Sequence, residues 1–130
     1  MERTTTVILT NMCMCYTQDK ILVMYRRKKD WSGLSFPGGH VEDNESLPDS
    51  IVREMKEETN LDIKNPKLCG TIEWDFGVRY IALLYKCNEF EGDIKPSKEG
   101  EIFWLDKDHL HDYPFSDDFD KILDIYGKSF

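Results

Sequence analysis

Three glutamates of this sequence have the type and spacing to do chemistry together. Glu54, Glu57 and Glu58 lie at positions i, i+3 and i+4, and on a helix of about 100° per residue they share one face. Like charges at this spacing repel one another, and a hard divalent cation removes the repulsion because it prefers carboxylate oxygens. The structural alternative is a solvated acidic face on which Arg53 pairs with Glu57. The carboxylates alone leave both interpretations open.

The helix that would carry these glutamates has recognisable ends. Ser46, with Asp49 three residues later, resembles a capping box, and Pro48 suits the first turn, where its missing N–H does no harm. These residues predict a helix over positions 47–59. A tight Phe-Pro-Gly-Gly turn is expected just before it, at positions 36–39.

The rest of the chain supplies strands and one further helix. Runs of β-branched and apolar residues predict strands at 4–14, 21–25, 34–36, 67–75, 78–87 and 102–105, with loops at 31–33 and 88–100. The C-terminal spacing of Phe119, Ile122, Leu123 and Tyr126 predicts an amphipathic helix, capped by Ser116 or Asp117. The fold class is therefore α/β (α+β), in one domain covering residues 1–130.

Composition narrows the function class. The formal net charge of −8 argues against a general nucleic-acid surface, so no stable nucleic-acid complex is expected. No signal pattern and no run of about 18 apolar residues is present, which predicts a cytoplasmic protein without a membrane segment. The four cysteines form no metal-binding or redox pair pattern, and we expect buried free thiols.

The segment from Gly38 to Leu61 also follows a fixed pattern. It matches G-x5-E-x7-R-E-U-x-E-E-x-G-U, where U is a bulky aliphatic residue. The matching residues are Gly39, Glu45, Arg53, Glu54, Met55, Glu57, Glu58 and Leu61. In this segment, called the signature segment below, the chain resembles the Nudix hydrolases.

This resemblance implies a fold, a reaction and a set of roles. The fold would be the Nudix fold, a mixed β-sheet sandwiched between α-helices, and the reaction would be hydrolysis of a nucleoside diphosphate linked to another group. Mg2+, or alternatively Mn2+, would be the cofactor. The implied metal ligands are Glu54, Glu57 and Glu58 with the Gly39 carbonyl, Gly38 and Glu45 are structural, and Arg53 orients the carboxylates, chiefly Glu57.

One residue departs from the pattern. Asn60 stands where the signature has glycine after the helix. Asparagine is the next best residue for a left-handed helix end. The turn should therefore survive, and Asn60→Gly should raise the melting temperature slightly.

The general base is less narrowly defined. In relatives a glutamate before the last strand takes this role or binds a second metal, which makes Glu99 the first candidate and Glu101 the second. A glutamate of the signature segment could serve instead. Both candidates could also be ordinary loop carboxylates.

Substrate-binding candidates lie outside the signature segment. In MutT-like relatives an arginine after the second strand contacts the phosphates, which points to Arg27 first and Arg26 second, although a solvated basic run is the alternative. Phe36, Trp31 and Tyr80 could stack on a base or belong to the core. Asp117, or its neighbour Asp118, would read a purine edge unless it caps the last helix.

Together these expectations describe a MutT-type pyrophosphohydrolase. Its substrate would be a nucleoside triphosphate, such as the oxidised purine nucleotide 8-oxo-dGTP, and its products nucleoside monophosphate and pyrophosphate. A nucleotide sugar, a dinucleotide or an RNA 5′ end remains an alternative substrate, as does a nucleotide-sensing module without catalysis. A homodimer also remains open.

Overall fold

The strand β1 (Val7–Cys15) lies at the centre of the main sheet in the computed structural model. The structure describes residues 3–28, 31–95, 98 and 100–127, without the side chains of Lys28 and Trp31. β1 pairs in parallel with β7 (Arg79–Cys87) and antiparallel with β4 (Gly38–His40). β7 pairs antiparallel with β6 (Lys67–Asp75), so the sheet order is β4-β1-β7-β6. The sheet is therefore mixed, as predicted.

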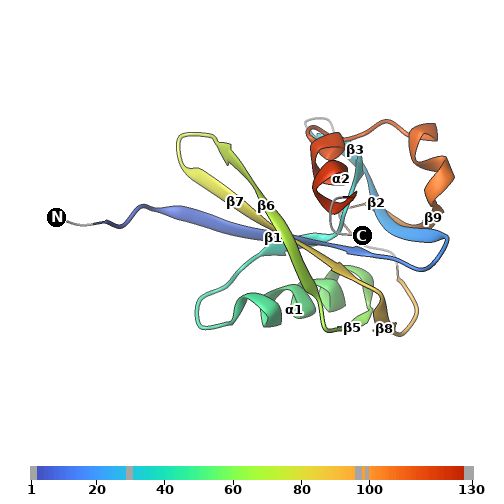
Figure 1. The fold of residues 1–130 in the computed structure, drawn as a ribbon, viewed down its shortest axis with the longest axis horizontal. Helices are drawn as coiled ribbons and strands as arrows, with labels where there is room; N and C mark the ends of the chain where they lie inside the picture. Colours follow the sequence, from blue (N-terminus) through green and yellow to red (C-terminus); the bar gives the residue numbers. More distant parts are fainter. Residues whose placement is uncertain (1–2, 29–30, 96–97, 99, 128–130) are drawn as a thin grey trace.

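Two smaller sheets complete the β structure. β2 (Lys20–Lys28) lies between β3 (Trp31–Ser35) and β9 (Glu101–Asp106), and both pairings are antiparallel. β5 (Asp62–Lys64) pairs with β8 (Glu89–Glu91). Figure 1 shows the three-stranded sheet beside the four-stranded one, with α1 below β1 and α2 above β1.

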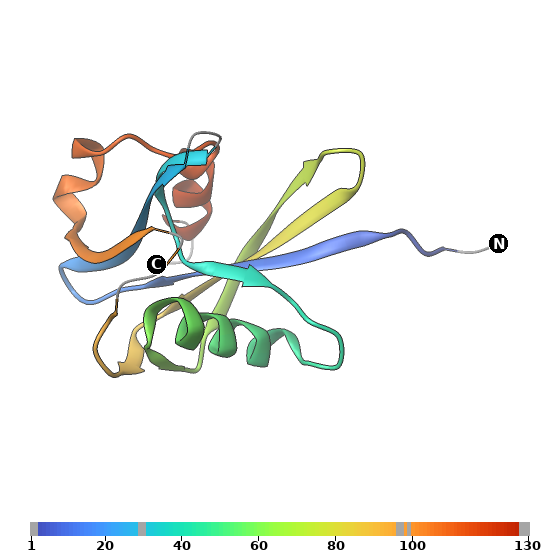
Figure 2. The same ribbon diagram turned by 180° about the vertical axis from the view of Figure 1, so that it is seen from behind.

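The two helices cover opposite faces of the main sheet. α1 (Leu47–Thr59) packs against β1 and β4, and α2 (Phe119–Gly127) packs against β6 and β7. The view from behind shows α1 and α2 again on opposite sides of β1 (Figure 2). A short 3-10 helix, η1 (Lys107–Asp112), follows β9. This arrangement confirms the α+β class and the sheet between helices.

Alternation along β1 builds both halves of the core. Cys13 packs in the cluster around Ile51 and Met55 of α1, whereas Met14 packs with Phe119 of α2. Successive side chains of a strand point to opposite faces, so β1 contributes to both clusters. Complete burial of Ile51 and Met55 fixes α1 against the sheet. Burying each of these side chains stabilises the fold by about 1.5–3 kcal/mol relative to leaving it exposed.

Several loop predictions were wrong. Positions 31–33 lie in β3, positions 38–40 form β4 rather than a turn, and β8 lies within the predicted loop at 88–100. β5 was not predicted at all. β4, β5 and β8 each pair with a strand distant in sequence, which local propensity does not register. β3 instead pairs with β2, the strand directly before it.

The predictions about the cysteines and about a membrane segment can be compared with the structure. Cys13, Cys15 and Cys87 are buried free thiols, as expected, whereas Cys69 is only half-buried. Among the described residues, no helix has both the length and the apolar character to cross a membrane.

Candidate active site

Local capping residues set both ends of the helix that carries the carboxylates. The Ser46 hydroxyl accepts a hydrogen bond from the Asp49 N–H at 3.1 Å, and α1 begins at Leu47, as predicted. At the other end Asn60 has φ 72° and ψ 5°, and its N–H donates to the Lys56 carbonyl. Asparagine therefore occupies the left-handed position predicted for it.

Arg53 holds three carboxylates at once. Its Nε and Nη2 donate to the two oxygens of Glu45 at 3.0 and 2.8 Å. Its Nη1 donates to Glu54 at 2.9 Å and to Glu57 at 3.1 Å, and Nη2 also reaches the His40 carbonyl. Glu57 is thus only one of its partners, and Glu45 makes the bidentate contact that is strongest for a guanidinium.

The charges of this network shift one another's pKa. The hydrogen bonds from Arg53, followed by the Glu42 backbone N–H, lower the pKa of Glu45 to about 2. The Glu45 hydrogen bond in turn raises the pKa of Arg53 further above its usual value. Both groups are therefore charged at neutral pH, and the Glu45 carboxylate is held by the Arg53 guanidinium.

Glu54 is the buried member of the carboxylate face. Its exposed fraction is 8%, and burial raises its pKa, while the Arg53 side chain and the His40 backbone oppose that shift. The backbone of Gly39 lies directly against its carboxylate, so that a Cβ at this position would overlap it. Glycine at position 39 is therefore needed for close approach rather than for backbone conformation.

Asn11 and Ser50 are site residues that the sequence analysis missed. The buried Asn11 side chain donates to the Ser50 hydroxyl at 2.9 Å and accepts from the Gly39 N–H at 3.0 Å. It thereby ties β1, β4 and α1 together beneath the carboxylates. A polar asparagine in the apolar strand VILTNMCMC was the available sign, because a buried amide needs partners.

The chemical type of these donor atoms, oxygen, suits a hard divalent cation. Three carboxylates at helical spacing, beside a glycine backbone, provide the oxygen ligands that Mg2+ prefers. In the described part of the chain, however, no three His, Cys, Asp or Glu side chains gather closely enough to hold a metal ion. Glu54 and Glu57 instead both accept from Arg53 Nη1.

The two arginines of β2 lie in different surroundings. Arg26 is buried, with an exposed fraction of 7%, and strand alternation places it on the face of Leu22, which packs in the α1 cluster. Arg27 is exposed, forms an ion pair with Glu101 at 3.2 Å and lies over the Tyr25 ring. The structure thus places Arg26, and not the preferred Arg27, on the side of α1.

The residues predicted to stack on a base or to act as the general base have different surroundings. Phe36 is buried in the core against Phe119 and Tyr126, with ring centroids 4.9 and 5.3 Å away, so the stacking prediction for it was wrong. Tyr80 contacts Phe76 at the β6–β7 turn, and Glu101 is paired with Arg27. Glu99 and the Trp31 side chain lie outside the described residues.

The aspartates before α2 have distinct surroundings. Asp118, at φ 64°, accepts a hydrogen bond from the Trp74 indole N–H at 2.7 Å, which lowers its pKa. Asp117 is exposed. The Ser116 hydroxyl donates to the Leu34 carbonyl at 2.6 Å and fastens this segment to β3, so its predicted capping role was wrong.

Comparison with known proteins agrees with this architecture. Residues 6–124 match the NUDIX domain family. The 8-oxo-dGTP diphosphatase of Proteus vulgaris is 30% identical over 88 residues, which cover 65% of this chain and 79% of that protein. The ADP-ribose pyrophosphatase of Methanocaldococcus jannaschii is 32% identical over 117 residues, 85% of this chain and 67% of that protein. The crystal structure of a MutT protein from Bacillus halodurans superposes with a TM-score of 0.77 at 26% identity, covering 92% and 80% of the two chains. The relatives that this chain resembles are named as hydrolases and pyrophosphatases. The chain therefore belongs to the Nudix hydrolases.

Proposed function

We propose that this chain is a Mg2+-dependent pyrophosphohydrolase of nucleoside triphosphates or related nucleoside diphosphate derivatives. Members of its family act on nucleotides and use divalent metal ions. The observation that carries the proposal is the carboxylate face of α1, where Glu54 and Glu57 share the Arg53 guanidinium beside Gly39. The products would be nucleoside monophosphate and pyrophosphate, and oxidised purine nucleotides such as 8-oxo-dGTP would be among the substrates.

The metal ligands in this proposal are Glu54, Glu57 and Glu58, with the Gly39 carbonyl. A bound Mg2+ would neutralise phosphate charge and activate water. The Glu57 side chain is 58% exposed and Glu58 is half-buried, while the buried Glu54 carboxylate is held by Arg53. Arg53 restrains two of these carboxylates, which reduces the entropy lost when they bind.

Other residues would bind the substrate and move its protons. Arg26 is the better candidate for a phosphate contact, because it lies on the α1 face of β2, whereas Arg27 pairs with Glu101. Glu99 remains the proposed base on sequence grounds, with a carboxylate of the signature segment as the alternative. Asp117 remains the proposed reader of the base, because the carboxylate of Asp118 accepts from Trp74.

The test is hydrolysis of a nucleotide panel. Canonical nucleoside triphosphates, 8-oxo-dGTP and ADP-ribose are incubated with Mg2+ or Mn2+, and monophosphate and pyrophosphate are quantified. Glu57→Gln should lower kcat at least about 100-fold. Glu91→Gln, a change of an exposed glutamate on β8, is the matched control and should leave kcat unchanged.

Two outcomes would overturn parts of this proposal. If the wild type hydrolyses no triphosphate, the MutT-type activity fails while the family assignment stands. If it binds nucleotides tightly without turnover, the chain is a nucleotide sensor, and Glu57→Gln then has no turnover to remove.

A further inference from the structure

Asn11 is the polar member of an otherwise apolar row of side chains. Strand alternation places every second residue of β1 on the side of α1, and these residues are Val7, Leu9, Asn11, Cys13 and Cys15. The Asn11 side chain is buried, with an exposed fraction of 3%. Burying an amide costs free energy that its hydrogen bonds only offset, so an apolar residue would serve stability at least as well. The hydrogen-bond partners of Asn11 therefore indicate why an amide occupies this position.

One partner of the Asn11 amide belongs to β4. Its Oδ1 accepts from the Gly39 N–H at 3.0 Å. β4 is a three-residue strand at the edge of the main sheet, so it pairs on one side only, with β1. The next residue, His40, donates its backbone N–H to the Glu54 carboxylate, and its carbonyl accepts from Arg53 at 2.9 Å. The bond from Asn11 therefore restrains a short edge strand at the point where it meets the carboxylates.

The other partner of the amide belongs to α1. Asn11 Nδ2 donates to the hydroxyl of Ser50 at 2.9 Å, and Ser50 is completely buried one turn before Glu54. The hydrogen bonds from Arg53 are the largest cause of the lowered pKa of Glu45, and one from the Ser50 hydroxyl adds to it. A chain of hydrogen bonds therefore runs from Asn11 through Ser50 and Glu45 to the guanidinium that holds the carboxylates.

Asn11 thus bridges the two elements that carry the proposed metal ligands. The Gly39 carbonyl belongs to β4, whereas Glu54, Glu57 and Glu58 belong to α1. We propose that Asn11 is a positioning residue, whose amide fixes the separation of Gly39 from Glu54 and thereby the affinity of the site for a divalent cation. The inference rests on the proposed function, because it takes Gly39 and Glu54 as metal ligands. Residues that orient metal ligands in this way contribute about 10–100-fold to metal affinity.

Mn2+ binding measures this role without turnover. Free Mn2+ is followed by electron paramagnetic resonance while nucleotide-free protein is titrated. Asn11→Leu keeps the branched shape of the side chain and removes both hydrogen bonds, so it should raise the Kd for Mn2+ at least about tenfold. Ser50→Ala cuts the link to α1 but leaves the Gly39 N–H bonded, and should raise the Kd by a smaller factor.

The double variant tests whether the two bonds form one bridge. Its Kd should fall short of the product of the two single effects, because Asn11→Leu and Ser50→Ala both cut the same connection. Effects that multiply fully would show two independent contacts and overturn the bridge.

Stability is measured separately, by thermal melts in EDTA, because Asn11 is buried. The double variant replaces both hydrogen-bonding side chains by apolar groups, which leaves stability nearly unchanged. It should therefore melt within about 3 °C of the wild type and still bind Mn2+ more weakly. If Asn11→Leu does not fold, Ser50→Ala alone decides. A Kd raised at least about threefold then supports the bridge, and a wild-type Kd overturns it.

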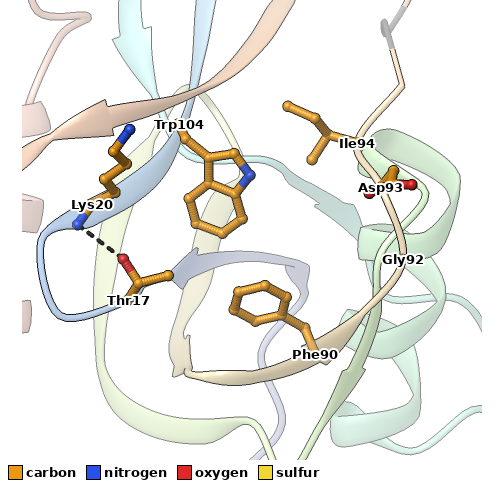
Figure 3. Close-up of a pocket in the computed structure, with 7 residues that line it drawn as sticks. All are labelled: Thr17, Lys20, Phe90, Gly92, Asp93, Ile94 and Trp104. Carbon is orange, nitrogen blue, oxygen red and sulfur yellow. Dashed lines mark hydrogen bonds between the residues drawn. The ribbon is translucent and has the colours of Figure 1, made fainter.

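Two threonine variants are the controls. Thr10 precedes Asn11 on β1, and its hydroxyl donates to the Ile81 carbonyl at 3.3 Å on the opposite face of the sheet. Thr17 accepts from the Lys20 N–H at 3.1 Å in the turn after β1, and Figure 3 shows this bond beside the pocket between β8 and β9. None of the described residues that line this pocket lies on α1. Thr10→Val and Thr17→Val each lose one hydrogen bond, and both should keep the wild-type Kd for Mn2+.

Kinetics add a second readout. At limiting Mg2+, Asn11→Leu should lower turnover, and saturating Mg2+ should restore most of it, because every ligand atom is still present. The KM for the nucleotide should stay at the wild-type value. A merely structural defect would reduce the amount of active protein at every Mg2+ concentration, and a loss of turnover that Mg2+ does not restore would overturn the positioning role.

Failure of this inference is distinguishable from failure of the proposed function. A wild type that binds Mn2+ but hydrolyses no nucleotide loses the proposed activity, and a raised Kd in Asn11→Leu then still supports the inference. A wild type that hydrolyses nucleotides, with an unchanged Kd in the folded double variant, keeps the activity and loses the inference. A wild type that binds no Mn2+ overturns both.

Discussion

The backbone of Gly39 lies against the carboxylate of Glu54, and no side-chain atom would fit between them. This contact joins β4 to the carboxylate helix at the point where the chemistry is proposed. It also explains why position 39 carries glycine although its backbone does not require one: among the described residues, the glycines with positive φ are Gly33, Gly77 and Gly92.

Gly39→Ala should therefore damage the site more than the fold. The added methyl group would displace Glu54 or shift β4, with a cost in unfolding free energy of about 1–3 kcal/mol. Turnover should fall at least about 100-fold, because misplacement of a catalytic group is amplified in the rate. Steady-state kinetics and chemical denaturation measure the two effects. Gly127→Ala, where a Cβ would meet nothing within 4 Å, is the control and should change neither.

Glu54→Gln should separate stability from activity. Burial raises the pKa of Glu54, so this group favours folding fully below its unfolded pKa, and that contribution is lost as pH rises through the folded pKa. At pH 7 a neutral glutamine removes the penalty of the buried charge and can still accept from Arg53. With metal chelated, the melting temperature should rise by about 2 °C, while turnover with Mg2+ collapses. A melting temperature below wild type would show that the Arg53 attraction outweighs burial.

Glu45 should give the protein an acid-sensitive anchor. Its pKa is lowered from 4.5 to about 2 in the folded protein, so its contribution to stability is present above pH 4.5 and is lost as pH falls toward 2. Glu45→Gln should lower the melting temperature at pH 7 by about 5 °C. Thermal melts between pH 7 and pH 2 should show this difference shrinking below pH 4.5. A difference that is constant across the range would contradict an electrostatic role.

The two aspartates before α2 should respond differently to the same change. Asp118→Gly keeps the left-handed backbone but removes the hydrogen bond from Trp74, and should lower the free energy of unfolding by about 1–2 kcal/mol. Asp117→Gly, at an exposed position, should change stability by less than about 0.5 kcal/mol. Urea denaturation checks both values. In the proposed function Asp117→Gly should instead alter the preference among purine nucleotides.

Features set by neighbouring residues in the chain were predictable from the sequence. Ser46 and Asn60 are local caps, and the helix between them was predicted with its observed bounds. The common face of the glutamates follows from helix geometry. Helix geometry also predicts that Arg53 lies near Glu57. The bidentate contact of Arg53 with Glu45 is not predicted, because it depends on the path of the loop before α1.

Features set by distant partners were not predictable in the same way. Which arginine of β2 faces α1 depends on strand register, because a shift of one residue exchanges the two faces. Phe36 is core because α2, more than 80 positions later, covers it. The Asn60 amide has its partner in Asp93, and loss of that hydrogen bond should offset the small gain first expected from Asn60→Gly.

The parallel pairing of β1 with β7 also governs the order in which the molecule can assemble. Val7 pairs with Arg79 and Cys15 with Cys87, so the whole signature segment lies inside the crossover between the two strands. A nascent chain that has delivered Glu54, Glu57 and Glu58 still lacks the strand that completes the sheet beneath them. Loop-closure entropy delays such long-range pairing, and the glutamate helix of a growing polypeptide would therefore lack its completed sheet until position 87 has left the ribosome.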